Sequence, residues 1–207
     1  MKKLKVVTVI GTRPEIIRLS RVLTKLDDNC EHIIVHTGQN YDYELNQIFF
    51  EDLQIRKPDF FLQAAGSSAM ETIGRIIIEV DKVLADVSAD ALLVLGDTNS
   101  CLSVIPAKRR KIPIFHMEAG NRCFDQRVPE EINRLATDSI ADLLFTPSPD
   151  GDENLKREGV PEHRIRFVGN IMIDTFEMMR PQIEAADTIL GRDIERGGHC
   201  VVTLHRP

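Results

Sequence analysis

Short apolar runs alternate with longer segments of helical period along the first 170 residues. The longer segments carry apolar residues three and four positions apart, the period of an amphipathic helix. Predicted strands span residues 4–10, 32–36, 91–95, 112–117, 143–146 and 165–168, and predicted helices span 14–26, 43–53, 69–87, 100–110, 129–140, 149–158 and 171–190. This alternation predicts βαβ units, and therefore an α/β fold with a doubly wound, Rossmann-like parallel sheet.

The pattern changes near the end of the chain. Residues 192–199 are polar and contain glycine, as in a linker, and residues 200–204 form a new apolar run of the strand type. We predict one domain over residues 1–170. Residues 171–207 are expected to be an inter-domain helix, a linker and the first strand of a second domain that is mostly absent. A strand added to the edge of the first sheet is the alternative, and length alone gives little preference between them.

Composition narrows the classes of partner. The chain has 207 residues, of which 43% are hydrophobic and 28% charged, as in an ordinary globular protein with a real core. The formal net charge is -6, and the main basic cluster is KRRK at residues 108–111. Nucleic acid requires a larger basic face, so it is not expected as a partner.

Cysteine spacing and hydropathy indicate the compartment. The four cysteines are far apart with no C-x-x-C pair, which favours reduced thiols over a disulfide framework or a zinc site (Cys30, Cys101, Cys123, Cys200). No apolar stretch has the length of a signal peptide or a membrane span. We therefore expect a cytoplasmic protein that does not contact a membrane.

The segment after the first predicted strand is the first candidate site, because ligands bind beyond the carboxyl ends of strands in open α/β sheets. This segment, GTRPE at residues 11–15, has a single glycine and lacks the G-x-G-x-x-G fingerprint, which argues against bound NAD. Pro14 suits the first helical position, so we expect Arg13 in the cap position, where a guanidinium beside a helix N-terminus would attract phosphate. Pairing of Arg13 with a nearby carboxylate is the alternative.

Three carboxylates follow other strands at the same predicted edge. Asp97 follows the strand at 91–95, Glu118 follows the strand at 112–117, and Glu130 begins the helix at 129–140. Taken singly, Asp97 could cap a helix. Glu130 could be an ordinary helix-start acid, stabilised by the helix dipole, or could pair with Arg134. Together, crowded carboxylates raise each other's pKa values, which suits general acid and base chemistry.

The histidines and the remaining motifs are less informative. No Ser-His-Asp or Cys-His arrangement is evident, and no spacing of ligands indicates a metal. His116 lies in a predicted strand and is interpreted as a core residue. His205 follows the predicted strand at 200–204, so it could face a cleft.

Seven segments, in order along the chain, resemble the non-hydrolysing UDP-N-acetylglucosamine 2-epimerase family. They are GTRPEIIRLS (11–20), HTGQNYD (36–42), GDTNS (96–100), HMEAGNR (116–122), VPEEINR (128–134), FVGNIMID (167–174) and VTLHRP (202–207). The resemblance implies the N-terminal domain of a two-domain fold of the GT-B type, with a nucleotide sugar in the cleft. It also implies a missing second domain with most contacts to uridine and diphosphate, and a homodimer at full length.

The resemblance further implies the reaction. UDP leaves as the anomeric C–O bond breaks, C2 gives its proton to a carboxylate to form a 2-acetamidoglucal, and UDP adds back with a proton on the other face. The motifs match Asp97, Glu118 and Glu130 to acid/base roles, and Arg13 and His205 to stabilisation of the departing diphosphate. Further substrate-binding candidates are Arg18, Gln39, Arg122 and Arg206. No cofactor or metal is implied.

Two departures from the commonest family pattern bear on which sugar is the substrate. Position 18 is Arg where many members carry Lys, and EAGNRCFDQRVPEE (118–131) replaces the more usual EAGLRT-type segment. Both resemble the subgroup that makes UDP-N-acetyl-L-fucosamine from UDP-N-acetyl-L-talosamine. The expected function is 2-epimerisation of a UDP-N-acetylhexosamine for surface polysaccharide precursors, of the UDP-GlcNAc to UDP-ManNAc type or of this second type. A non-catalytic nucleotide-sugar-binding fragment, or part of a GT-B glycosyltransferase, is the alternative from another class.

Overall fold

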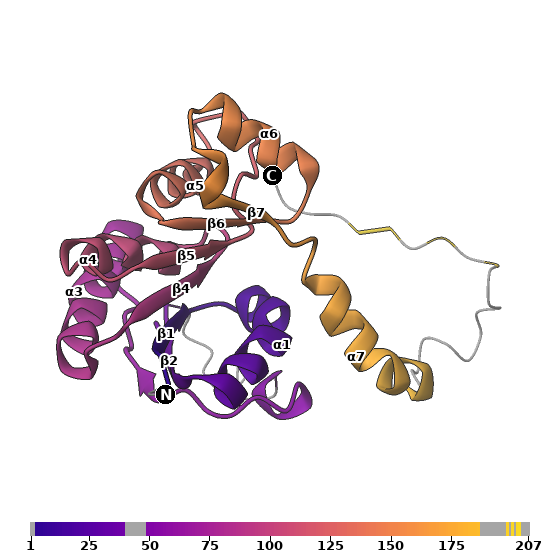
Figure 1. Ribbon diagram of the computed structural model, residues 1–207. Helices are drawn as coiled ribbons and strands as arrows, with labels where there is room; N and C mark the ends of the chain where they lie inside the picture. The colour runs from indigo at the N-terminus through magenta and orange to yellow at the C-terminus, as the bar shows by residue number, and fades with distance from the viewer. Residues whose placement is uncertain (1–2, 40–48, 187–197, 199, 201, 204–207) are drawn as a thin grey trace.

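The computed structural model describes residues 3–39, 49–186, 198, 200 and 202–203 (Figure 1). Within these residues, seven strands form one parallel sheet in the order β3-β2-β1-β4-β5-β6-β7. The strands are β1 (Lys5–Ile10), β2 (Glu31–His36), β3 (Phe60–Phe61), β4 (Ala91–Leu95), β5 (Ile114–Met117), β6 (Leu143–Thr146) and β7 (Ile165–Phe167). The order reverses between β1 and β4, so the sheet is doubly wound, as predicted.

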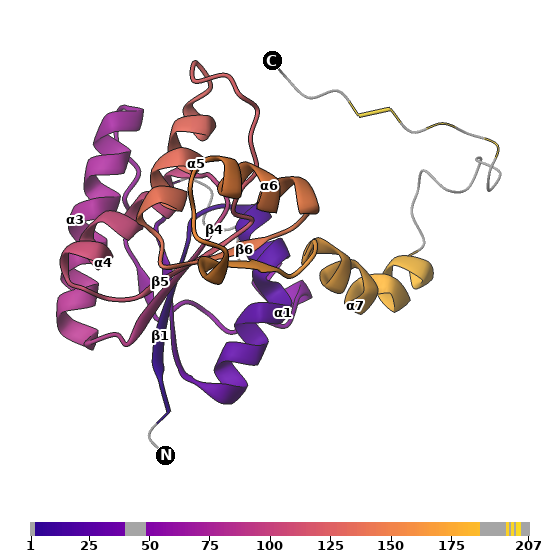
Figure 2. The same ribbon diagram turned by 45° about the horizontal axis from the view of Figure 1, so that its top comes forward.

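Helices connect the strands. The α-helices are α1 (Arg13–Asn29), α3 (Ala69–Val87), α4 (Val104–Arg109), α5 (Pro129–Ile140), α6 (Pro149–Arg157) and α7 (Met172–Ala185), and two 3₁₀ helices are η1 (Asn99–Ser103) and η2 (Glu162–Arg164). Figures 1 and 2 show α3 and α4 on one side of the sheet and α1 on the other. This three-layer arrangement follows from right-handed crossovers in opposite directions from the point where the strand order reverses.

Alternation of side chains along β1 divides the core into two parts. Val7 and Val9 pack against α3 and α4, whereas Val6 and Ile10 pack against the apolar face of α1. All four residues are buried, so β1 is covered on both faces, which explains why its sequence is an unbroken apolar run. Because β1 is packed on both faces, it holds the turn that begins at Gly11 in a fixed position.

The helix α7 packs on α1. The Thr175 hydroxyl donates to the carbonyl of Ile17 at 3.0 Å and lies 3.0 Å from the Ser20 hydroxyl. Thr175 is buried in this contact, whereas several apolar side chains of α7 are exposed. The predicted domain boundary at residue 170 remains a prediction.

Several expected elements differ from the observed ones. The predicted helix at 100–110 begins as the 3₁₀ turn η1, and β3 was not predicted because two residues form no apolar run. Residues 49–52 of the helix predicted at 43–53 are helical, and its earlier residues lie outside the described ones. Cys200, Val202 and Thr203 have no regular structure, and the other two positions of the strand predicted at 200–204 are not described, so the first strand of a second domain stays a prediction.

Among the described helices, none combines the length and the apolar character that a membrane span requires.

Candidate active site

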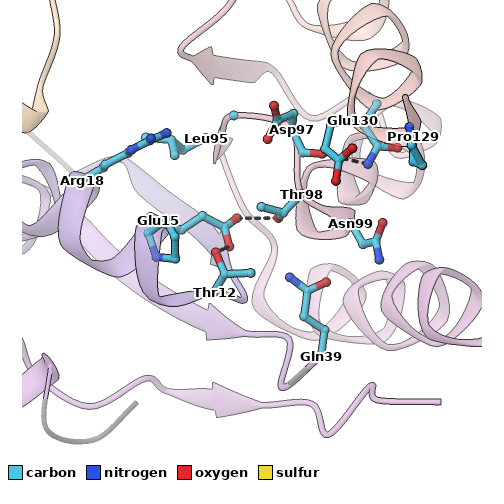
Figure 3. A pocket seen from close by; sticks show the side chains of 13 residues that line it. Thr12, Glu15, Arg18, Gln39, Leu95, Asp97, Thr98, Asn99, Pro129 and Glu130 are labelled. Atoms are coloured by element: carbon cyan, nitrogen blue, oxygen red, sulfur yellow. Dashed lines mark hydrogen bonds between the residues drawn. The ribbon is translucent and has the colours of Figure 1, made fainter. Parts of the chain in front are cut away.

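A pocket of about 570 Å³ opens at the carboxyl ends of the central strands. Figure 3 shows side chains from α1, from the turn after β4 and from α5 around it. Its lining residues are Thr12, Pro14, Glu15, Arg18, Gln39, Leu95, Gly96, Asp97, Thr98, Asn99, Pro129, Glu130 and Asn133. The pocket lies where the strand order reverses, the place at which open α/β sheets bind ligands.

The turn after β1 is closely surrounded. A Cβ atom on Gly11 would lie 2.1 Å from Thr37 Oγ1, 2.4 Å from Ser100 Oγ and 2.7 Å from Gln39 Nε2. These side chains come from the segments that follow β2 and β4, so three strand ends converge on one glycine. Only glycine fits there without displacing its neighbours.

Arg13 does not occupy the cap position, and that expectation is wrong. Helix α1 begins at Arg13, and Thr12 is the extended cap residue before it. Proline is tolerated within the first helical turn because the N–H that it lacks would have no helical partner there, so Pro14 does not force Arg13 out of the helix. Arg13 is exposed, and its side chain is not among those that line the pocket.

Glu15 was not predicted, although it lines the pocket. Its carboxylate is 1% exposed and accepts hydrogen bonds from Gly11 N–H at 3.0 Å and from the hydroxyls of Thr12 at 2.8 Å and Thr98 at 3.0 Å. Burial raises the pKa of Glu15 to about 7, and the hydrogen bonds offset only part of that rise. The spacing Thr12-x-x-Glu15, typical of a helix start, is the signal that could have identified it.

Asp97 is held by two residues of α5. Arg134 reaches its Oδ2 with Nη2 at 2.6 Å, and the side-chain amide of Asn133 donates to the Asp97 carbonyl at 2.8 Å. Arg134 also pairs with Glu131 at 2.6 Å, so the alternative pairing with Glu130 is wrong. The side chain of Asp97 is therefore fixed at the pocket wall without capping a helix.

Glu118 projects back toward α1. Its backbone is left-handed, with φ 62°, and Arg18 Nη1 lies 2.6 Å from its Oε2. Burial raises the pKa of Glu118; Arg18 opposes that rise and the charge of Asp97 adds to it. A left-handed conformation is costly for a residue with a side chain and is often retained where it orients a functional group.

The two neighbouring glutamates of α5 differ in environment. Glu130 is exposed and lines the pocket, on the side of Asp97 (Figure 3). Glu131 is 2% exposed and accepts backbone hydrogen bonds from Cys123 and Phe124 at 3.1 and 2.9 Å. Glu131 thus secures the preceding loop, and Glu130 is the one available to a ligand.

Arg122 lies in a buried ion-pair network, away from the pocket lining. Its side chain is 1% exposed, with Nη1 2.8 Å from Asp138 Oδ2 and Nη2 2.6 Å from Glu158 Oε2. Asp138 also lies 2.7 Å from Nδ1 of His116, whose Nε2 is 2.8 Å from the Gly96 carbonyl. The interpretation of His116 as a core residue is confirmed, and Arg122 is placed to hold the fold together.

Three candidates remain: Gln39, His205 and Arg206. His205 and Arg206 are outside the described residues. Gln39 lines the pocket and donates to Ser100 Oγ at 3.2 Å. Among the described side chains, no group of three or more His, Cys, Asp or Glu residues is arranged to hold a metal ion.

Comparisons with known proteins identify the family of the chain. The model of the family described as UDP-N-acetylglucosamine 2-epimerase matches residues 24–207. The UDP-N-acetylglucosamine 2-epimerase homolog of Methanococcus maripaludis is 39% identical over 98% of this chain and 57% of its own length. The chain thus spans a little more than half the length of this curated relative.

Solved structures show the same fold. The UDP-N-acetylglucosamine 2-epimerase of Rickettsia bellii matches with a TM-score of 0.85 and 52% identity, over 89% of this chain and 50% of that one. The Methanocaldococcus jannaschii UDP-GlcNAc 2-epimerase in complex with UDP-GlcNAc and UDP matches with a TM-score of 0.85 and 38% identity, over 89% of this chain and 51% of that one. The described chain therefore has the Rossmann-like N-terminal domain of a GT-B-type fold, as predicted.

Proposed function

Because the chain belongs to the UDP-N-acetylglucosamine 2-epimerase family, we propose that it supplies the acid/base groups of a nucleotide-sugar 2-epimerase. The proposed substrate is a UDP-N-acetylhexosamine, either UDP-GlcNAc converted to UDP-ManNAc or UDP-N-acetyl-L-talosamine converted to UDP-N-acetyl-L-fucosamine. The complex of the M. jannaschii enzyme with UDP-GlcNAc and UDP supports a UDP-sugar as the ligand. Surface polysaccharide synthesis in the cytoplasm, by a homodimer, is the expected setting.

One observation carries the proposal: three predicted carboxylates and an arginine meet at one pocket. Asp97, Glu130 and Arg18 line it, and Glu118 is joined to Arg18 at its edge. No carbonyl activates the C2 proton of a pyranose, so the anomeric C–O bond must break first. UDP then leaves with the bonding electron pair, and a carboxylate takes the C2 proton as the C1–C2 double bond forms.

Return of the proton to the opposite face requires acid/base groups on more than one side of the ring. Asp97 and Glu130 come from the turn after β4 and from α5, whereas Glu118 follows β5 and is met by Arg18 of α1. This arrangement supports proton transfer on two sides of a bound sugar. Arg13 and His205 are proposed to offset the charge of the departing diphosphate, and Arg18 is proposed as a further substrate-binding residue.

The test is NMR of UDP-GlcNAc and of UDP-N-acetyl-L-talosamine incubated in D2O, without an acceptor. Each sugar is treated with this chain and with a version extended through a second domain. Deuterium at C2 of the epimerised product supports the proposal and identifies the sugar. Consumption of the donor only when an acceptor is added would indicate a transferase, and no exchange under any condition would indicate a binding module.

Substitution then tests the site itself. Asp97→Asn should lower the exchange rate at least about 100-fold, the usual size of an acid/base contribution. Asp150→Asn is the matched control, because Asp150 is an exposed aspartate in the first turn of α6, outside the pocket lining. Equal rates for the two variants would remove Asp97 from the proposed mechanism.

A further inference from the structure

Two glutamates occupy the same position relative to a helix start and differ in their burial and in the direction of their pKa shifts. Glu15 follows Thr12 by three residues in α1, and Glu71 follows Ser68 by three residues in α3. Glu71 is partly exposed, and hydrogen bonds from Ser67 lower the pKa of its carboxyl group. Glu15 is buried, with its pKa raised to about 7. Helix capping explains Glu71 and leaves the burial of Glu15 unexplained.

The two oxygens of Glu15 connect two strand ends. Oε2 accepts from Gly11 N–H and from the Thr12 hydroxyl, both in the turn after β1. Oε1 accepts from the hydroxyl of Thr98, in the turn after β4, and Figure 3 shows this bond crossing between the two segments. Ser100 Oγ lies 3.5 Å from Oε2. The sequence separation of 83 residues between Glu15 and Thr98 makes this a tertiary contact, not a local cap.

A third segment joins the same network. Gln39, after β2, donates from Nε2 to Ser100 Oγ at 3.2 Å, and Ser100 in turn faces Glu15. The turn that holds Thr98 also holds Asp97, and the turn that holds Thr12 leads into Arg13 and Arg18. Glu15 is therefore the shared acceptor between the segments that position the proposed catalytic and diphosphate-facing groups.

The charges already in the pocket determine whether neutral or charged Glu15 is compatible with a bound diphosphate. Arg18, Asp97 and Glu130 line the pocket together with Glu15, Glu118 is joined to Arg18, and Cys101 lies close enough to Glu15 for their charges to interact. Arg18 is already paired with Glu118. A further full negative charge beside the first turn of α1 would oppose a diphosphate, which that helix end otherwise favours.

We propose that Glu15 is a positioning residue that works as the neutral acid, holding the turn after β1 against the turn after β4 without adding negative charge to the pocket. This inference rests on the proposed function for its effect on turnover. When Glu15 is protonated, the bond to Thr98 reverses its direction: Glu15 donates to Thr98 Oγ1 through one oxygen and still accepts from Gly11 and Thr12 through the other. A glutamine side chain can make the same set of bonds, whereas alanine makes none of them.

The experiment compares pH profiles of kcat/KM for C2 deuterium exchange in the extended protein. The wild type should lose activity as pH rises through about 7, where Glu15 becomes charged. Glu15→Gln should retain at least about a tenth of the wild-type value at pH 6 and lose this decrease at higher pH. Glu15→Ala should lose about 100-fold at every pH, the usual consequence of a misplaced catalytic group. Glu71→Gln is the matched control and should keep the wild-type profile.

A second measurement separates this inference from the proposed function. In the 207-residue chain labelled with ¹³C at the glutamate carboxyl carbon, the signal that is missing in Glu15→Gln should titrate with a midpoint near 7. A midpoint at the ordinary glutamate value of about 4.3 would overturn the inference, as would an unchanged high-pH decrease in Glu15→Gln. If wild-type protein exchanges no deuterium with either sugar, the proposed function fails while the titration still tests the neutral acid.

Discussion

His36 should make the stability of this protein depend on mildly acidic pH. Its side chain is fully buried at the end of β2, stacked on Phe61 with ring centroids 5.0 Å apart. Burial lowers the pKa of His36 to about 4, and its Nδ1 accepts a hydrogen bond from Gly38 N–H at 3.0 Å, which only the neutral ring can do. The imidazole ring of His36 thus binds its second proton more weakly in the folded state than in the unfolded chain.

The size of the effect follows from the two pKa values. With about 6.5 in the unfolded chain and about 4 in the folded protein, the stabilisation is complete above pH 6.5 and is lost as pH falls toward 4. The full loss is about 3 kcal/mol, and about 2 kcal/mol of it is reached at pH 5. Because the pKa of His32 is also lowered, mainly by burial, the wild type alone would not isolate His36.

The assay is urea unfolding of the wild type and of His36→Gln at pH 8 and pH 5. The loss of unfolding free energy between the two pH values should be smaller in His36→Gln by about 2 kcal/mol. His163→Gln, which removes an exposed histidine of η2, should keep the wild-type loss. Equal pH dependence in wild type and His36→Gln, or an NMR titration midpoint of His36 near 6.5, would refute the reasoning.

Three further predictions concern stability and binding. Gly11→Ala should displace the neighbouring side chains, because the new Cβ would lie 2.1 Å from Thr37 Oγ1. UDP-sugar binding in the extended protein, measured by calorimetry, should therefore weaken, and an unchanged affinity would contradict the convergence of three strand ends on Gly11. Arg122→Met should lower the unfolding free energy by about 3–5 kcal/mol, since it leaves the buried carboxylate of Asp138 without its arginine. Arg127→Gln should leave the unfolding midpoint unchanged, because its ion pair is on the surface and its side chain is 90% exposed.

The sequence predicts the framework because burial on both faces leaves a strong pattern. The apolar runs at 91–95 and 143–146 match β4 and β6, and the helical period at 129–140 matches α5. The short edge strand β3 leaves no such pattern, and the first turn of η1 looks like ordinary helix in sequence. Short elements are therefore the ones that sequence reasoning misplaces.

The sequence predicted which residues lie at the strand ends around the site, but not which side chains contact one another there. Asp97 follows a predicted strand and Glu130 begins a predicted helix, and both line the pocket. The left-handed backbone of Glu118 and the partner that Arg134 finds in Asp97 depend on tertiary packing, which residue spacing does not encode. Glu15 was missed because an acid near a helix start is ordinary in sequence, and only the structure shows that it is buried.

The position of β1 at the centre of the sheet has a consequence for synthesis on the ribosome. Its pairing with β2 can form early, but its other edge stays unpaired until the chain has grown past Leu95, the end of β4. At about 5–20 residues per second, this delay lasts several seconds. Throughout it, an apolar strand with free N–H and C=O groups is open to intermolecular pairing, so nascent chains of this protein should depend on chaperones until β4 emerges.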